Sequence, residues 1–177
     1  MNMKKSLVIA MSGIITGLSV VAMFLGSVVW IFSYVMPIVA GLLIIILSAS
    51  VGKKSGLYVF FATCVLSLIL LPDKEPALLY SFFFGYYPLI KDALDGIKSR
   101  LLKLVTKLVI FNIAMVASQL VLVYVFGIPF DNFMGKWSWA ILLALANVVL
   151  VLYDKMFDIV VIVYNRKYRH IFEKLLK

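Results

Sequence analysis

Five polar residues stand out in or beside apolar stretches of the sequence, because their side chains can donate and accept hydrogen bonds. They are one acid, one tyrosine and three amides: Glu75, Tyr80, Asn112, Gln119 and Asn147. Asn112 and Gln119 are seven residues apart, which places them on one face of a helix. Grouped around a pocket, the five side chains could bind a small polar molecule. Paired with one another, the amides could instead hold neighbouring helices together, and the sequence leaves both interpretations open.

A second set of polar residues is charged and lies near the ends of apolar stretches. Asp154 follows an apolar stretch that begins at Trp137, about 26 Å away along a helix axis. A carboxylate at that depth needs a cation, and we expect a structural ion pair with Lys91 or Lys107. A proton relay is the alternative, because Asp158 lies one helical turn further on.

The surroundings of these residues follow from the composition. Of the 177 residues, 64% are hydrophobic, and the mean hydropathy is +1.11. A soluble chain of this length needs a mostly polar surface, so the solvent for most side chains must be lipid. The net charge of +9 comes from short basic clusters between apolar stretches, which is typical of membrane topology signals and not of nucleic-acid binding. The single cysteine, Cys64, excludes an intrachain disulfide, and we interpret it as a packing residue.

The apolar stretches predict an all-α, polytopic membrane protein with six transmembrane helices. At about 20 residues per crossing, residues 6–51 hold two helices, with Trp30 and Tyr34 at the membrane boundary and Pro37 in the first turn of the second helix. An acidic turn bracketed by prolines, 72–76, precedes the fourth helix. The predicted helices are 6–26, 34–51, 57–71, 76–90, 104–126 and one from 137 past 153.

Lysine and arginine predict the orientation, because they gather on the cytoplasmic side of a membrane. Of the 17 basic residues, only Lys74 and Lys136 fall in segments that six crossings would place outside. We therefore expect both the N- and the C-terminus to be cytoplasmic, in a multi-pass protein of the cell (plasma) membrane. Residues 1–177 would form a single six-helix domain.

Three inner segments carry most of the basic residues. A tight basic turn is predicted at 52–56, and a short amphipathic cytoplasmic helix at about 89–103, where apolar residues recur every three or four positions. The C-terminal tail is the third segment, and we interpret His170 there as a solvated residue.

Small residues follow the first predicted helix at four-residue spacing. They form two pairs, Ser12 with Thr16 and Gly13 with Gly17. Small side chains allow another helix to approach closely. The pairs therefore predict either internal packing or a docking face for a partner.

A partial catalytic motif lies in the inner amphipathic segment. Residues 92–100 (DALDGIKSR) resemble the first half of the CDP-alcohol phosphatidyltransferase motif, whose carboxylates bind metal ions. That family continues with a glycine and two aspartates where this sequence has Val109, Ile113 and Ala117. A lipid-processing enzyme is therefore the least favoured alternative, and we expect no catalytic residue, no metal and no cofactor.

The layout as a whole resembles the substrate-binding S components of energy-coupling-factor (ECF) transporters. These have six helices, both ends inside and a basic cytoplasmic face. The segments 85–91 (GYYPLIK) and 147–154 (NVVLVLYD) are similar to those of small bacterial membrane proteins loosely grouped with S components. S components present an Ala-x-x-x-Ala ridge on the first helix to a coupling subunit. Here Gly13 with Gly17, and Ser12 with Thr16, occupy that helix instead.

The resemblance implies capture of a vitamin-like micronutrient from outside. A transmembrane coupling subunit and two ATPases would supply the energy, with membrane lipids as the other partners. The substrate-binding set would be the five polar residues named first, covered by Trp30 and Tyr34. The alternative is a membrane scaffold or assembly protein without transport activity, which would bind partners through residues 91–107 and the C-terminal tail and would hold no buried polar cavity.

Overall fold

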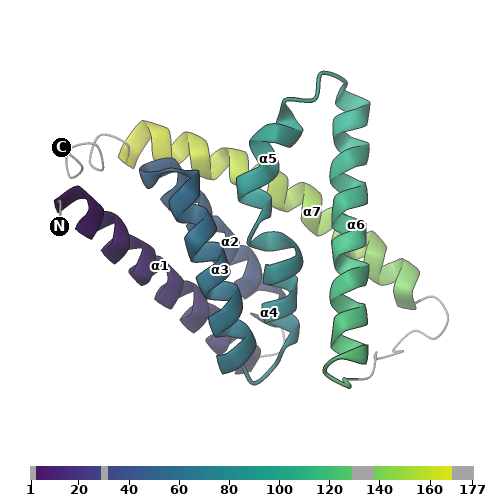
Figure 1. The fold of residues 1–177 in the computed structure, drawn as a ribbon. Coiled ribbons are helices and arrows are strands. Elements are labelled where there is room, and N and C mark those ends of the chain that lie inside the picture. The colour runs from purple at the N-terminus through teal and green to yellow at the C-terminus, as the bar shows by residue number, and fades with distance from the viewer. Residues whose placement is uncertain (1–2, 29–31, 129–137, 169–177) are drawn as a thin grey trace.

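The computed structural model describes residues 3–28, 32–128 and 138–168, and this part of the chain consists of helices joined by turns and short loops, without a strand (Figure 1). The predicted all-α class is therefore confirmed for the described residues. In chain order the elements are α1 (Met3–Val28), α2 (Phe32–Val51), α3 (Lys53–Leu70), α4 (Glu75–Leu79), η1 (Tyr80–Phe84), α5 (Tyr87–Asp95), α6 (Arg100–Tyr124), α7 (Ser138–Val163) and η3 (Tyr164–Tyr168).

Four of the described helices are long and apolar enough to cross a membrane: Lys5–Val28 within α1, and the whole of α2, α3 and α6. Their outward faces carry large apolar side chains, such as Ile14, Phe61 and Ile113, each more than half exposed. Water would not tolerate so many exposed apolar side chains, whereas lipid would. The chain is thus a membrane protein by these criteria.

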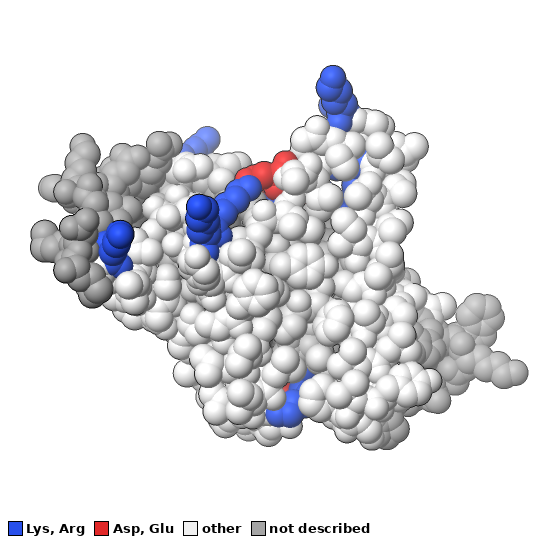
Figure 2. Space-filling model, in the orientation of Figure 1, with Lys and Arg blue, Asp and Glu red and all other residues white. Residues whose placement is uncertain are grey.

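Charged side chains lie mainly at one edge of the molecule. Figure 2 shows lysine and arginine over the start of α1, the α2–α3 junction and the start of α6. The exposed basic residues of these segments are Lys5, Lys53, Lys54, Lys98 and Arg100, and we call them the basic edge. A smaller charged group lies at the opposite edge, over the turn between α3 and α4. The surface between the two edges is almost free of charge in this view.

The predicted fourth helix, 76–90, is not continuous. It is divided into α4, the π-helix η1 and α5, with a turn at Gly85 and Tyr86. The wide turn of η1 is closed by a hydrogen bond from the Gly85 N–H to the Tyr80 carbonyl oxygen, 2.8 Å long. Pro88 has no N–H to continue the helix and lies in the first turn of α5, where that donor is not needed.

The predicted amphipathic helix at 89–103 is also divided, so this prediction is wrong. Helix α5 ends at Asp95, and α6 begins at Arg100. Gly96 follows the end of α5, and the Ser99 side chain accepts a 3.4 Å hydrogen bond from the Leu102 N–H as the cap of α6. A glycine followed by a capping serine ends one helix and starts another, even though the apolar period continues across both.

Several helices begin a few residues before the predicted positions, and two of these differences affect predicted features. Helix α3 already begins at Lys53, so the turn predicted at 52–56 is reduced to Gly52. The φ of Gly52 is 104°, a conformation that favours glycine. Helix α2 begins at Phe32, so Pro37 lies inside it and Tyr34 lies in its first turn. Tyr34 is therefore not part of a covering loop. Trp30 lies outside the described residues.

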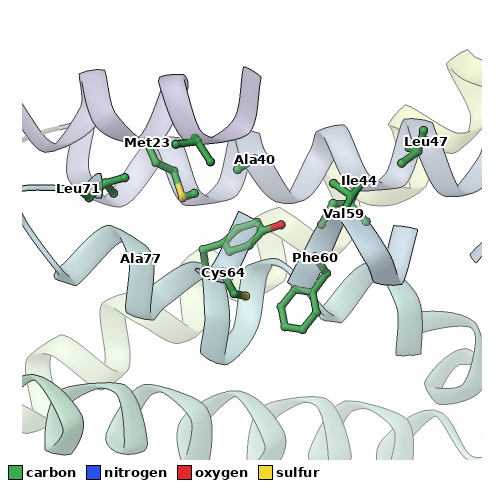
Figure 3. Close-up of a cluster of buried hydrophobic side chains, with 11 residues drawn as sticks. Met23, Ala40, Ile44, Leu47, Val59, Phe60, Cys64, Leu71 and Ala77 are labelled. Carbon is green, nitrogen blue, oxygen red and sulfur yellow. The ribbon is translucent and has the colours of Figure 1, made fainter. Parts of the chain in front are cut away.

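The buried side chains form two clusters that meet at η1. The first joins α1, α2 and α3, where Met23, Ala40 and Phe60 pack together (Figure 3). Cys64 is buried in this cluster, as its packing role predicts. The second cluster joins η1 to α5, α6 and α7 and contains Phe83, which is fully buried. Tyr80 of η1 belongs to the first cluster and Phe83 to the second, so the π-helix connects the two halves.

Candidate functional site: a buried ion-pair network

Lys91 is the centre of a charged network between α5, α6 and α7. Its side chain is only 2% exposed. The ammonium lies 2.6 Å from Asp154 Oδ1, 2.9 Å from Asp95 Oδ2 and 3.1 Å from Asp158 Oδ1. It also lies 5.1 Å from the ring centroid of Phe157. A buried ammonium is tolerated only with such compensation, and three carboxylates and an aromatic face supply it.

Lys107 of α6 connects the same carboxylates from the other side. Its Nζ lies 2.7 Å from Asp95 Oδ1 and 2.9 Å from Asp154 Oδ2. Asp95 and Asp154 therefore each contact both lysines, which closes a ring of four charged side chains. The Tyr87 hydroxyl also donates a hydrogen bond to Asp154 Oδ1. The ring connects three helices by charge-assisted hydrogen bonds, the strongest kind available to side chains.

The network reaches solvent at one side. Asp158 is 59% exposed and Asp95 is 35% exposed, whereas both lysines are buried. Lys103 Nζ lies 3.8 Å from Asp95 Oδ1. The network thus contains three lysines and three carboxylates. Asp95 is the last residue of α5 and lies outside the four candidate spans. Burial alone would raise the pKa of Asp95, but hydrogen bonds from Lys107 and Lys91 outweigh it, and the pKa lies below its ordinary value.

The sequence predicts the ion pair of Asp154 with Lys91 or Lys107 and places Asp158 one turn beyond Asp154, but it does not predict the other members of the network. Asp154 lies against both Lys91 and Lys107, the two cations proposed for it. Asp95 and Tyr87 were overlooked, although Tyr87, Lys91 and Asp95 recur every four residues and so share one face of a helix. A charged face of an amphipathic helix is ordinarily solvated. Only the position of α7 shows that this face is buried.

Two of the predicted substrate-binding residues hydrogen-bond to each other. Asn112 Nδ2 donates to Asn147 Oδ1 over 3.0 Å, and Asn147 Nδ2 donates to Asn112 Oδ1 over 3.2 Å. Each Nδ2 also donates to the carbonyl oxygen four residues earlier, on Leu108 and Leu143. All four amide hydrogens are thereby used. This arrangement matches the packing interpretation of the amides more closely than the ligand interpretation.

The other predicted binding residues lie in two separate places. Gln119 Nε2 of α6 is 3.5 Å from Glu75 Oε1 at the start of α4, a long hydrogen bond. Tyr80 is fully buried in the first core cluster, and its hydroxyl has no hydrogen-bond partner among the described residues. The Thr63 hydroxyl is buried and unpartnered in the same way. The five polar residues therefore do not line one common pocket.

The small residues of α1 divide between two faces. Thr16 is 8% exposed and faces the bundle, and Ser12 is half-buried. Gly13 and Gly17 are exposed, and a Cβ added at either position would meet no atom within 4 Å. The Gly13-x-x-x-Gly17 pair therefore faces away from the described part of the protein and does not pack inside it.

The two carboxylates of the partial phosphatidyltransferase motif are each bound to lysine. Asp92 forms a 2.7 Å ion pair with Lys53 of α3, and Asp95 belongs to the buried network. Across residues 3–28, 32–128 and 138–168, no group of three or more histidine, cysteine, aspartate or glutamate side chains is placed to hold a metal ion.

No protein-family model matches this chain, and comparison with curated proteins and with solved structures finds no match.

Proposed function

We propose that this protein is the membrane-embedded substrate-binding subunit of an importer of the ECF type. It would cross the cell membrane six times with both termini in the cytoplasm. Helices α1, α2, α3 and α6 supply four candidate crossings. The predicted fourth helix, 76–90, and the 26-residue helix α7 would supply the other two. The basic edge would face the cytoplasm, as the distribution of lysine and arginine favours.

The main support for this proposal is the face of α1 that points away from the helical bundle. Gly13 and Gly17 are exposed with open space around them, although glycine lowers helix stability and offers lipid no side chain. Two exposed glycines four residues apart allow a second helix to approach the backbone closely. In the proposed assembly, the second helix belongs to the coupling subunit, which works with two ATPases.

The substrate would bind from the outer side. The 3.5 Å contact between Glu75 and Gln119 is the weakest hydrogen bond of the predicted set and the easiest to exchange for a ligand. Asn112 and Asn147 would position α6 against α7, and Tyr80 would contribute from η1. A vitamin-like molecule with polar groups suits these side chains.

Copurification tests the assembly. The tagged protein, expressed in its native host and extracted in mild detergent, is expected to recover a transmembrane coupling subunit and two ATPases. Gly13→Leu with Gly17→Leu should abolish the recovery, because leucine would hold the two helices apart. Ala62→Leu is the matched control, since Ala62 is an exposed small residue on α3. Recovery of the protein alone, or equal recovery with both variants, would refute the proposal.

The closed amide pair favours a second candidate, a membrane scaffold or assembly protein. Asn112 and Asn147 satisfy each other and leave no amide hydrogen for a substrate. Such a protein would bind its partners through the basic segment around α5 and α6. Native mass spectrometry of the purified protein distinguishes the two candidates. A small molecule that is retained, and lost in Gln119→Leu, supports the importer; copurified proteins without any small molecule support the scaffold.

A further inference from the structure

A groove of about 400 Å³ lies between α6 and α7, on the surface of the helical bundle. Its walls are almost entirely apolar. They are formed by Leu104, Leu108, Asn147, Val148, Val151 and Leu152. With α6 and α7 crossing the membrane as proposed above, this groove would face the acyl chains of lipids.

The two walls run in opposite chain directions. Lys107 of α6 contacts Asp154 of α7, whereas Asn112, further along α6, contacts Asn147, which is earlier on α7. The two helices therefore run in opposite senses along the groove, and they cross obliquely (Figure 1). The N-terminal part of α6 and the C-terminal part of α7 point toward the same end of the groove, on the side of the ion-pair network.

Each wall continues toward that end into a cation. On α6, Arg100 precedes Leu104 by four residues and Leu108 by eight, so the three share one stripe. On α7, Lys155 follows Leu152 by three residues and Val148 by seven, which again gives one stripe. The groove is thus apolar along its length and has a basic residue beyond each wall at the same end.

Both cations are available to an external anion. Arg100 and Lys155 are exposed, and neither pairs with an acidic side chain in the part of the chain that the structure describes. By contrast, the nearby lysines Lys91, Lys103 and Lys107 are all held by carboxylates. A guanidinium binds phosphate with two parallel hydrogen bonds, and a lysine adds a point charge.

We propose that the α6–α7 groove binds one anionic phospholipid, with an acyl chain along its apolar walls and the phosphate on Arg100 and Lys155. Apolar walls that end in cations match a lipid that has a hydrocarbon chain and an acidic headgroup. A zwitterionic lipid would match the walls but not the charge. The bound lipid would cover Asn147, which lines the groove, and so shield its hydrogen bonds with Asn112 from competing polar groups.

Lipid titration of the purified, delipidated protein tests this site. Phosphatidylglycerol is expected to bind in native mass spectra and to raise the unfolding temperature more than phosphatidylcholine does. Arg100→Gln with Lys155→Gln should weaken phosphatidylglycerol binding roughly tenfold or more, because each cation near a headgroup contributes substantially to its attraction. Lys5→Gln with Lys54→Gln is the matched control. It removes the same charge from exposed lysines of the basic edge, away from the groove, and should leave binding unchanged.

The apolar half of the site has its own test. Val148→Trp fills the groove and should reduce the binding of phosphatidylglycerol. Ile113→Trp, at an exposed position of α6 outside the groove, should not. If Lys5→Gln with Lys54→Gln reduced phosphatidylglycerol binding as much as Arg100→Gln with Lys155→Gln, the binding would reflect general charge attraction, and the proposal would be overturned. Equal binding of the two lipids, or a Val148→Trp variant that loses a copurified protein instead of lipid, would overturn it as well.

Discussion

The Lys91 ammonium lies 2.6 Å from Oδ1 of Asp154, although the two residues are 63 positions apart in the chain. The contact joins α5, which follows the π-helix, to the middle of α7. Lys107 completes the connection from α6. The ion pairs hold α5, α6 and α7 in one register, because they demand a defined geometry. The other contacts among these helices are mostly apolar, and apolar contacts tolerate sliding.

Removing the central cation should destabilise the protein strongly. Lys91→Met leaves Asp154 and Asp95 with Lys107 as their main compensation, and breaking a buried pair on one side costs about 3 kcal/mol. Lys53→Met is the matched control, because Lys53 also joins α5 to another helix through an aspartate, Asp92. That pair is exposed and should contribute less than about 1 kcal/mol. Denaturant unfolding in mild detergent measures both. Equal losses would show that the burial of Lys91 carries no energetic weight.

Acid should weaken the network through Asp95. Its pKa is lower in the folded protein than in the unfolded chain, so folding favours the ionised carboxylate. The resulting stability is fully present above the unfolded pKa of about 3.9 and is lost as the pH falls through the lower folded value. Unfolding followed from about pH 6 down to about pH 2 should show this decline below about pH 4, and Asp95→Asn should make the curve flatter there. A decline of the same steepness in Asp95→Asn would mean that other groups cause it.

The reciprocal amide pair should show strong coupling. Asn112→Leu alone leaves Asn147 Oδ1 and one of the Asn147 amide hydrogens without a partner, at a cost of about 1 kcal/mol inside a membrane protein. The double variant with Asn147→Leu removes both polar groups and should be more stable than the sum of the two single effects predicts. A double-mutant cycle on the unfolding free energy measures the difference. Purely additive effects would show that the two amides do not depend on each other.

Much of the helical layout could be predicted, because apolar stretches and their proline and glycine boundaries are local signals. The partner of Asp154 was equally accessible, since few cations lie at a matching depth. The break before Pro88 was not predicted. Gly85 lies at this break, where a Cβ would be 2.7 Å from the Phe60 ring, and the close approach of the turn after η1 to α3 has no local signature in the sequence.

The burial of charge was harder to predict than its pairing. Lys91 and Asp95 lie on the charged face of an amphipathic segment, and such a face is ordinarily solvated. It is buried here because α7 brings Asp154 and Asp158 to it. For the same reason, the seven-residue spacing of Asn112 and Gln119 predicted a shared face. It could not predict that Asn112 would bond to Asn147 and Gln119 to Glu75.

One glycine at the meeting point of the two core clusters gives the sharpest test of the fold. Tyr153 of α7 donates a 2.9 Å hydrogen bond to the Phe84 carbonyl oxygen of η1, and Gly41 of α2 lies directly against this bond. A Cβ on Gly41 would lie 2.4 Å from both the carbonyl and the hydroxyl oxygen, and a backbone carbonyl cannot easily move away.

Gly41→Ala should therefore destabilise the protein by about 1–3 kcal/mol, as overpacking does. Gly13→Ala is the control, because its Cβ would enter open space and alanine is the better helix former, which should add up to about 1 kcal/mol of stability. The free energy of unfolding of the two variants is measured in the same detergent. Both variants exchange glycine for alanine, but their changes in stability are expected to have opposite signs. If Gly41→Ala were neutral, α2, η1 and α7 could not be packed as closely as the Tyr153 hydrogen bond requires.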